Sequence, residues 1–147
     1  MNINLTQHEA DTLLKLEKHY RDDKLLTYPL LGGYLQIPLF SDDFREEFIL
    51  SVRRSKIELK RNTFQTRTRK TIILARIDIA GPLHRNPDGE EIPCPHLHLY
   101  REGDNDRWAK PLPDVFRDPN DTWETLNDFM DFCIVITKPL IVRELFA

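Results

Sequence analysis

The chain has 147 residues, of which 40 % are hydrophobic and 31 % are charged, and its formal net charge is −3. This composition excludes an intrinsically disordered chain, and no apolar run approaches the roughly 20 residues of a transmembrane helix. The two cysteines, Cys94 and Cys133, are too few for a disulfide framework. We therefore expect one cytoplasmic domain spanning residues 1–147.

The predicted elements begin with a helix, because Thr6 and Glu9 have the spacing of a capping box. This helix is expected to end near Tyr20. Strand-favouring residues then recur in four segments, which are 34–40 (an edge strand, since it contains Pro38), 48–59, 64–79 and 96–101. Asn62 is the predicted point of reversal between the second and third segments.

A second helix is predicted to begin at Asp121 or Thr122, with Glu124 in a second capping box. Its apolar residues share one helical face, which should pack on the sheet: Trp123, Leu126, Phe129, Met130 and Cys133. A final extended piece covers 141–146. The sequence therefore predicts a single α+β domain, with a mainly antiparallel sheet of about five or six strands between an N-terminal and a C-terminal helix.

Charge is distributed unevenly along the chain. Between residues 53 and 70 there are eight bases and one acid, Glu58, a local charge of +7. The bases are Arg53, Arg54, Lys56, Lys60, Arg61, Arg67, Arg69 and Lys70. Such a stretch is typical of a surface that binds phosphates or other anions. Alternatively, the long side chains cover apolar neighbours, or pair with the acidic C-terminal third of the same or a neighbouring molecule.

The segment Asn86-Pro87-Asp88-Gly89 is a strong turn signal, and it predicts a hairpin in which residues 86 and 90 are opposite each other. Continued along both strands, this register places Asp78 opposite His98 and Arg76 opposite Tyr100. The aliphatic residues Ile77, Ile79, Leu97 and Leu99 then lie on the other face. Ile72 and Leu74 are expected on the polar face, further along the strand.

The polar face of this hairpin is the candidate catalytic site. A carboxylate such as Asp78 beside His98 orients the imidazole for proton transfer, and His96 or Tyr100 is the second acid–base group. Arg76 is expected to stabilise an anion. The alternative is that these five residues form only a structural hydrogen-bond network on a half-exposed sheet.

Metal binding is a weaker hypothesis for the same hairpin. Cys94, His96 and His98 alternate along one strand, His84 lies across the hairpin, and zinc accepts such nitrogen and sulfur ligands. Pro93 and Pro95 flank Cys94, however, and no established metal motif supports a site. We therefore expect no cofactor.

The run CPHLHLYREG, followed by Trp108-Ala109, is the most distinctive part of the sequence. Together with the upstream basic strands, it resembles a family of short bacterial proteins known only as a domain of unknown function, over about Leu5 to Phe146. The resemblance implies a bacterial or phage-borne cytoplasmic protein, and it implies no activity, cofactor or catalytic residue.

These features favour a protein that binds RNA or another anionic ligand. In this hypothesis it acts on RNA as a metal-independent ribonuclease of toxin size. The basic segment would hold the RNA backbone, and the histidines with Asp78, Arg76 and Tyr100 would carry out proton transfer. The first alternative is a non-enzymatic protein-interaction or inhibitor module, which can also self-associate. The second is a metal-binding protein. No membrane partner is expected.

Overall fold

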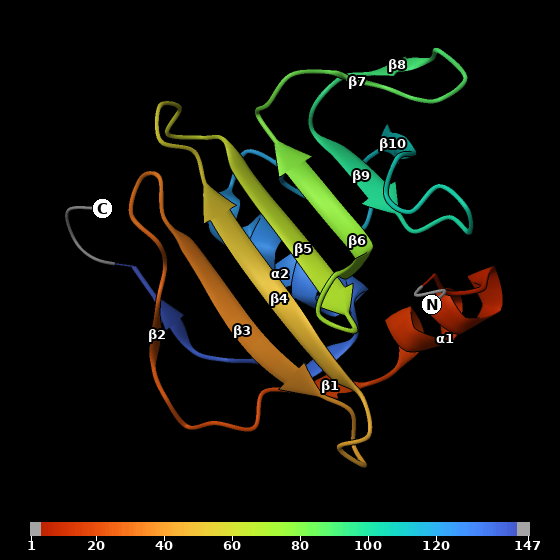
Figure 1. The fold of residues 1–147 in the computed structure, drawn as a ribbon. Helices are drawn as coiled ribbons and strands as arrows, with labels where there is room; N and C mark the ends of the chain where they lie inside the picture. The colour runs from red at the N-terminus through yellow and green to blue at the C-terminus, as the bar shows by residue number, and fades with distance from the viewer. Residues whose placement is uncertain (1–3, 144–147) are drawn as a thin grey trace.

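The computed structural model describes residues 4–143, which form two helices and one large mixed sheet (Figure 1). The sheet has eight strands in the order β10-β9-β6-β5-β4-β3-β1-β11, and two-stranded pairs β12-β2 and β7-β8 lie outside it. The strands of the large sheet are β1 (Lys18–His19), β3 (Tyr34–Phe40), β4 (Glu47–Arg54), β5 (Asn62–Thr68), β6 (Ile72–Ile79), β9 (His96–Leu99), β10 (Ala109–Pro111) and β11 (Val135–Thr137). The outer pairs are β2 (Leu26–Thr27) with β12 (Ile141–Val142), and β7 (His84–Arg85) with β8 (Glu91–Ile92).

Both predicted helices are confirmed, with different ends. Helix α1 (Gln7–Lys15) begins after the Thr6–Glu9 capping box, and it ends before Tyr20 because β1 begins at Lys18. Helix α2 (Thr122–Phe132) is capped by Asp121, whose side chain accepts from two backbone amides of the first turn. All five residues of its predicted apolar face pack in or against the core.

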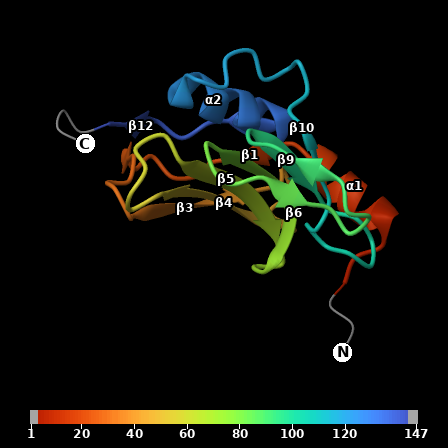
Figure 2. The same cartoon turned by 90° about the horizontal axis from the view of Figure 1, so that it is seen from above.

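Helix α2 covers one face of the sheet, and the other face is open along most of β3, β4 and β5 (Figures 1 and 2). Phe64 of β5 and Phe129 of α2 meet across the covered face, with ring centroids 6.3 Å apart. Side chains alternate between the faces of a strand. Thr63 and Gln65, the neighbours of Phe64, therefore lie on the open face.

The expected α+β arrangement is present, but the sheet has more strands and is not purely antiparallel. The pairs β1–β11 and β2–β12 are parallel. The segment predicted as one strand over 64–79 is a hairpin, because Arg69 and Lys70 adopt positive φ angles and reverse the chain. Asn62 is the first residue of β5, and the reversal before it occupies residues 55–61.

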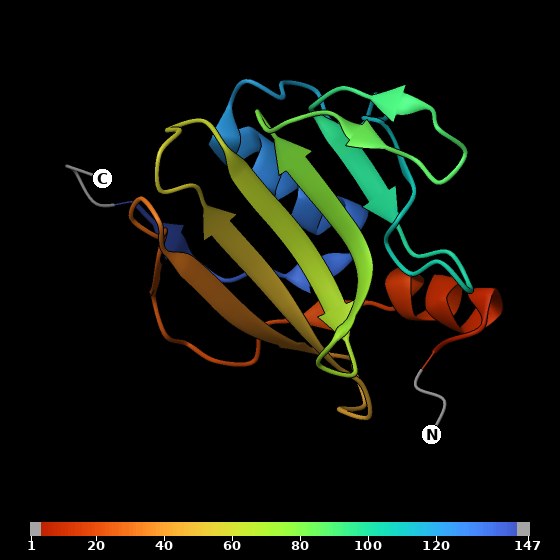
Figure 3. The same cartoon turned by 45° about the horizontal axis from the view of Figure 1, so that its top comes forward.

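The predicted turn at 86–89 is confirmed, because the amide of Asn86 donates to the Glu90 carbonyl and His84 pairs with Ile92. The register predicted for the large sheet is wrong by two residues: Asp78 pairs with His96, and Arg76 pairs with His98. The strands β7 and β8 form a separate hairpin beyond the ends of β6 and β9 (Figure 3). Prolines in the connecting segments cannot donate to a ladder, so the two registers are independent.

A bulge in β6 reverses the predicted positions of two aliphatic side chains. Thr66 pairs with Ala75 and Arg67 with Ile73, which leaves Leu74 as an extra residue. Ile72 and Leu74 therefore lie in the core, and not on the polar face as predicted. On the other side of the bulge the alternation agrees with the sequence: Ile77, Ile79 and Leu97 are buried in the core.

Neither helix within residues 4–143 is long and apolar enough to cross a lipid bilayer. The expected extended piece at 141–146 is represented by β12, and residues 144–146 lie outside the described part of the chain.

Candidate functional site

The strand registers place polar side chains in two rows across the open face. The first row reads Tyr34, Arg53, Thr63, Asp78 and His96, and the second reads Gln36, Ser51, Gln65, Arg76 and His98. Because the register error is an even number of residues, it leaves Arg76, Asp78, His96 and His98 on their predicted face. Four of the five predicted catalytic residues therefore still lie together.

Asp78 is at the centre of this group. Its Oδ2 atom lies 3.1 Å from Nε2 of His96 and 3.2 Å from Nε2 of His98. The same oxygen is 3.2 Å from Nη2 of Arg76, and Oδ1 accepts from the Thr63 hydroxyl at 3.2 Å. The predicted contact between Asp78 and His98 is therefore made, but diagonally.

Burial alone would raise the pKa of the Asp78 carboxyl. The hydrogen bond from His96, the close contact with His98 and the charge of Arg76 outweigh this effect and hold the pKa well below its ordinary range. Asp78 is therefore a carboxylate throughout the neutral range, and it serves as an acceptor and counter-ion rather than as a proton donor.

His98 is completely buried, and both of its ring nitrogens are occupied. Nδ1 lies 2.8 Å from the carbonyl oxygen of Asp106, to which it donates. Nε2 lies 3.0 Å from Nη2 of Arg76, which is itself bound to the Asp106 carboxylate at 2.7 Å through Nη1. We call Arg76, Asp78, His96, His98 and Asp106 the Asp78 cluster, in which His98 positions its neighbours.

His96 borders a cavity of about 360 Å³ at the end of the open face. Its Nε2 donates to Asp78, and its Nδ1 lies 3.2 Å from the carbonyl of Ile92. The Cys94 sulfur lies 3.6 and 3.9 Å from the two ring nitrogens, so it sits over the ring rather than in line with either nitrogen. Burial also raises the pKa of the Cys94 thiol. Cys94 is therefore not an activated nucleophile.

His84 is a residue of this cavity that the sequence indicated only as a weak metal ligand. Its ring centroid lies 4.6 Å from that of His98 and 6.0 Å from that of His96. Nε2 donates to the carbonyl of Arg107 at 2.7 Å, which leaves Nδ1 as a lone-pair acceptor. The β7–β8 hairpin positions it, and Asn86 ties that hairpin to both backbone polar groups of Ala109 in β10.

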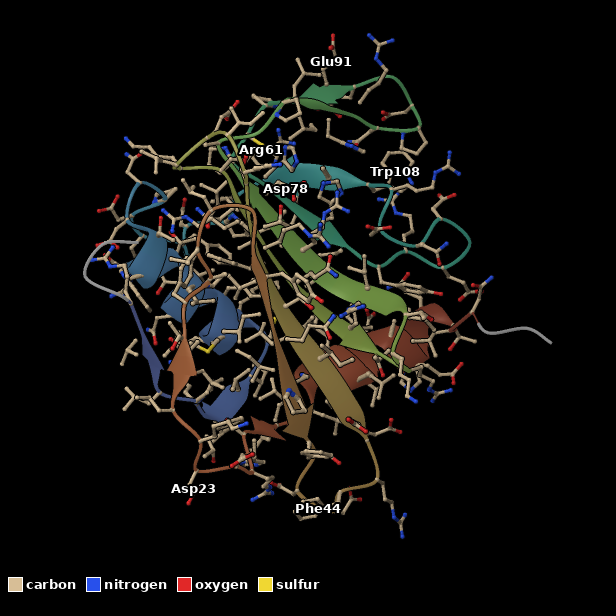
Figure 4. The ribbon with its side chains drawn as sticks, turned by 60° about the vertical axis from the view of Figure 1, so that its left-hand side comes forward. Asp23, Phe44, Arg61, Asp78, Glu91 and Trp108 are labelled. Carbon is tan, nitrogen blue, oxygen red and sulfur yellow. The ribbon has the colours of Figure 1, made fainter. Side chains whose placement is uncertain are left out.

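Arg61 also borders the cavity, and it lies with Asp78 at the end of the sheet below the hairpin that carries Glu91 (Figure 4). Thr63 and Gln65 complete the polar wall. Sequence reasoning missed these two residues, because their position beside Asp78 follows only from the pairing of β5 with β6.

Tyr100 does not join the Asp78 cluster. Its hydroxyl donates to the Leu5 carbonyl at 2.6 Å and accepts from the Leu5 amide at 2.9 Å. The tyrosine lies beyond the β6 bulge, where its amide bonds to the Leu74 carbonyl and its ring is in the core. This geometry gives Tyr100 a structural role, joining β9 to the start of α1.

Two smaller cavities continue from the first along the open face, with volumes of about 170 and 290 Å³. We call the three together the polar groove. Five of the eight predicted anion-binding bases line it: Arg53, Arg54, Lys56, Arg61 and Arg67. Lys60 lies in the exposed 55–61 loop, and Arg69 and Lys70 form the turn at the opposite end of β5.

None of the eight bases forms an ion pair with any residue in 4–143. The acids of the C-terminal third pair elsewhere, as Asp128 does with Arg117 and Asp131 with Lys138. Within the described chain, the basic segment is therefore not neutralised by the acidic one.

Asp78, His96 and His98 form a donor set that could hold a metal ion, since their ligand atoms all lie within 4.8 Å of one another. Both histidines direct Nδ1 at a backbone carbonyl, as metal-ligating histidines do. The guanidinium of Arg76 lies against two of the three ligands, however, so a metal must displace it. Cys94 and His84, the other two residues of the metal hypothesis, are outside this set of ligands.

The chain belongs to the family described as "Family of unknown function (DUF6978)", whose model matches residues 5–135. This match confirms the predicted resemblance to a family of unknown function, while the bacterial or phage origin and the cytoplasmic location stay predictions. Comparison with curated proteins and with solved structures finds no match.

Proposed function

We propose that this member of the family binds single-stranded RNA along the polar groove, with a backbone phosphate in the 360 Å³ cavity beside Asp78. The observation that carries the proposal is that five bases without ion-pair partners in residues 4–143 line three neighbouring cavities, all of which share Thr63 in their walls. Cations placed in this way attract a polyanion, and they release its counter-ions when it binds.

The cavity supplies donors that suit a phosphate. Arg61 is exposed at its rim, and Thr63 and Gln65 present a hydroxyl and an amide. The buried Nε of Arg76 has no hydrogen-bond partner among the described residues. Asp78 and Asp106 share the positive charge of Arg76, so the cation that attracts a phosphate to this cavity is Arg61 at its rim.

A single strand fits this surface better than a duplex does. An open sheet face can hold splayed nucleobases, which stack on aromatic side chains. The sugar–phosphate chain then follows the lysine and arginine side chains of the protein. Tyr34 supplies an exposed aromatic ring at the far end of the first row, with the Arg53 guanidinium 5.9 Å from its centre.

The test is fluorescence anisotropy with a labelled single-stranded RNA at low and moderate salt. We expect Arg53→Gln with Arg61→Gln to lower affinity about tenfold or more, and to reduce the salt dependence of binding. The matched control, Arg69→Gln with Lys70→Gln, removes the same charge from the far turn and should change affinity less than about twofold.

Equal losses in the two double variants, or no binding at low salt, would contradict the proposal. Either result would favour the non-enzymatic interaction or inhibitor module. Equal affinity for DNA of the same sequence would contradict the restriction to RNA.

A second candidate function is metal-independent cleavage of the bound RNA, favoured by the position of His84 and His96 on one cavity. Nδ1 of His84 takes the proton of a 2′-hydroxyl, and the 2′-oxygen attacks the adjacent phosphorus. The bond from phosphorus to the 5′-oxygen breaks, and that oxygen takes the Nε2 proton of His96, which gives up its hydrogen bond to Asp78 in this step. The products are a 2′,3′-cyclic phosphate and a 5′-hydroxyl, with Arg61 and Arg76 stabilising the phosphorane.

Cleavage is tested by following a 5′-labelled RNA in the presence of EDTA and identifying the cyclic phosphate end. His84→Ala should lower the rate about 100-fold or more, whereas His8→Ala, on the exposed face of α1, should leave it unchanged. Binding without any cyclic phosphate product would rule out the catalytic candidate and leave the binding proposal intact.

A further inference from the structure

The smallest cavity of the polar groove, of about 170 Å³, has its own chemical character. It lies between β3, β4 and β5, and its lining includes Tyr34, Gln36, Ser51, Arg53, Gln65 and Arg67. Its volume is about half of the smallest typical pocket for a whole ligand, roughly 300 Å³. A space of this size suits one planar ring system rather than a nucleotide with its sugar and phosphate.

The Arg67 guanidinium is the best defined recognition group of this cavity. Its Nη2 donates to the Ser51 hydroxyl at 3.0 Å, which fixes the plane of the group. Its Nε is buried and has no hydrogen-bond partner among the described residues. An unsatisfied buried donor is unfavourable, so an acceptor on a ligand would be bound there with a gain in free energy.

The remaining walls complete a site for a base. Tyr34 has an exposed fraction of 65 %, which leaves its ring free to stack on a ligand. Gln36 and Gln65 flank Ser51 in the same row, and each offers an amide oxygen and an amide nitrogen. The cavity therefore combines a stacking ring, a fixed guanidinium and two amides.

We propose that this cavity is a guanine-binding subsite, and that the RNA bound in the groove is selected for a guanine next to the phosphate site. Guanine presents two acceptors, O6 and N7, on the edge that a guanidinium recognises, whereas adenine presents a donor in place of O6. The amide oxygens of Gln36 and Gln65 accept from the N1–H and N2–H groups of guanine. This inference rests on the proposed RNA binding.

The spacing of the two sites agrees with this assignment. The guanine subsite is centred on β4, and Asp78 lies on β6, two strands away. Neighbouring strands are about 4.8 Å apart, so the two centres are separated by about 10 Å. One nucleotide spans this distance from its base to a neighbouring phosphate.

The experiment is a titration of the protein with GMP, AMP, CMP and UMP, followed by NMR of the glutamine side-chain amides and the Arg67 Nε–H. We expect GMP to bind about tenfold or more tightly than AMP. Arg67→Lys should remove this preference, because an ammonium lacks the planar pair of donors. Tyr34→Leu, at an exposed position, should weaken all four nucleotides alike.

The control variant is Arg69→Lys, which changes the same residue type outside the groove and should keep the preference. Equal affinities for the four nucleotides, or a guanine preference that survives in Arg67→Lys, would overturn the inference. Failure of the two proposals can be told apart: salt-dependent RNA binding without base preference refutes only the guanine subsite. GMP binding without binding of longer RNA refutes the proposed function and the selection of RNA, and it leaves the guanine-binding cavity itself supported.

Discussion

Asp78 and His96 are direct partners across β6 and β9, and their Oδ2 and Nε2 atoms are 3.1 Å apart. The imidazole is almost completely buried, whereas the carboxylate retains 22 % of its exposure and reaches the groove. This pair therefore links the buried half of the Asp78 cluster to the surface on which a ligand would bind. Changes at Asp78 should affect both the stability of the protein and its surface chemistry.

Substituting Asp78→Asn should lower the free energy of unfolding by about 2–3 kcal/mol, because charge-assisted hydrogen bonds to His96 and Arg76 are lost. The pH dependence has a defined sign. The folded-state pKa lies below the unfolded value near 3.9, so the unfolded chain binds more protons. Stability is therefore complete above about pH 5 and falls as the solution is made more acidic.

Urea denaturation between about pH 3 and pH 7 measures this effect. The acid-dependent loss of stability should be smaller in Asp78→Asn than in the parent. It should be unchanged in Asp114→Asn, which alters an exposed aspartate outside the cluster. The same acid dependence in all three proteins would show that Asp78 is not its source.

Tyr100→Phe separates a structural from a catalytic role for the tyrosine. The hydroxyl makes two buried hydrogen bonds with the backbone of Leu5, so its removal should cost about 1–3 kcal/mol of stability. RNA affinity and any cleavage rate, measured well below the midpoint of thermal unfolding, should not change. A loss of activity without a loss of stability would instead restore Tyr100 to the catalytic group.

The candidate site could be predicted in part, because alternation along a strand depends only on sequence. It placed Arg76, Asp78, His96 and His98 on one face, and an error of two residues in register left that result intact. The partner of Asp78 could not be derived, since the hairpin at 86–89 and the main sheet are separated by prolines that interrupt the ladder.

Features that depend on tertiary packing were missed. Nothing in the local sequence around Leu74 indicates a bulge, yet the bulge moves Leu74 into the core, where Tyr100 bonds to it. His84 enters the site because Asn86 anchors its hairpin to β10, a contact between residues 23 positions apart. The ends of α1 and the extra strands β1 and β11 likewise depend on pairing between distant segments.

Lys18 gives a second pH dependence, in the alkaline range. It is completely buried, and its ammonium donates to the carbonyls of Leu14, Leu16 and Cys133 at the ends of both helices. Burial lowers its pKa to about 8. The unfolded value is near 10.4, so between these two values the unfolded state binds more protons, and stability rises with pH.

The difference in unfolding free energy between the parent and Lys18→Met isolates this contribution. It should increase by roughly 1–3 kcal/mol in favour of the parent from about pH 7.5 to pH 10.5. Lys15→Met, at the end of α1, provides a control that removes a lysine without a buried ammonium. A difference that stays constant across this range would mean that Lys18 keeps its ordinary pKa.

Arg76 controls whether the Asp78 cluster can accept a metal. Its Nη2 lies 3.2 Å from Oδ2 of Asp78 and 3.0 Å from Nε2 of His98, so the guanidinium competes with a cation for two of the three ligands. Arg76→Ala removes both the positive charge and the steric block. Zinc affinity, measured by competition with a fluorescent chelator, should therefore rise about tenfold or more in this variant.

The matched control is Arg53→Ala, which removes a groove charge three strands from His96 and should leave zinc affinity unchanged. Adding His98→Ala to Arg76→Ala should abolish the gain, because the set then has only two ligands. Zinc affinity in Arg76→Ala that is no higher than in the parent would contradict this prediction. It would mean that the three ligand atoms do not converge well enough to bind a metal, and that the Arg76 guanidinium is the cation that the Asp78 cluster is built to hold.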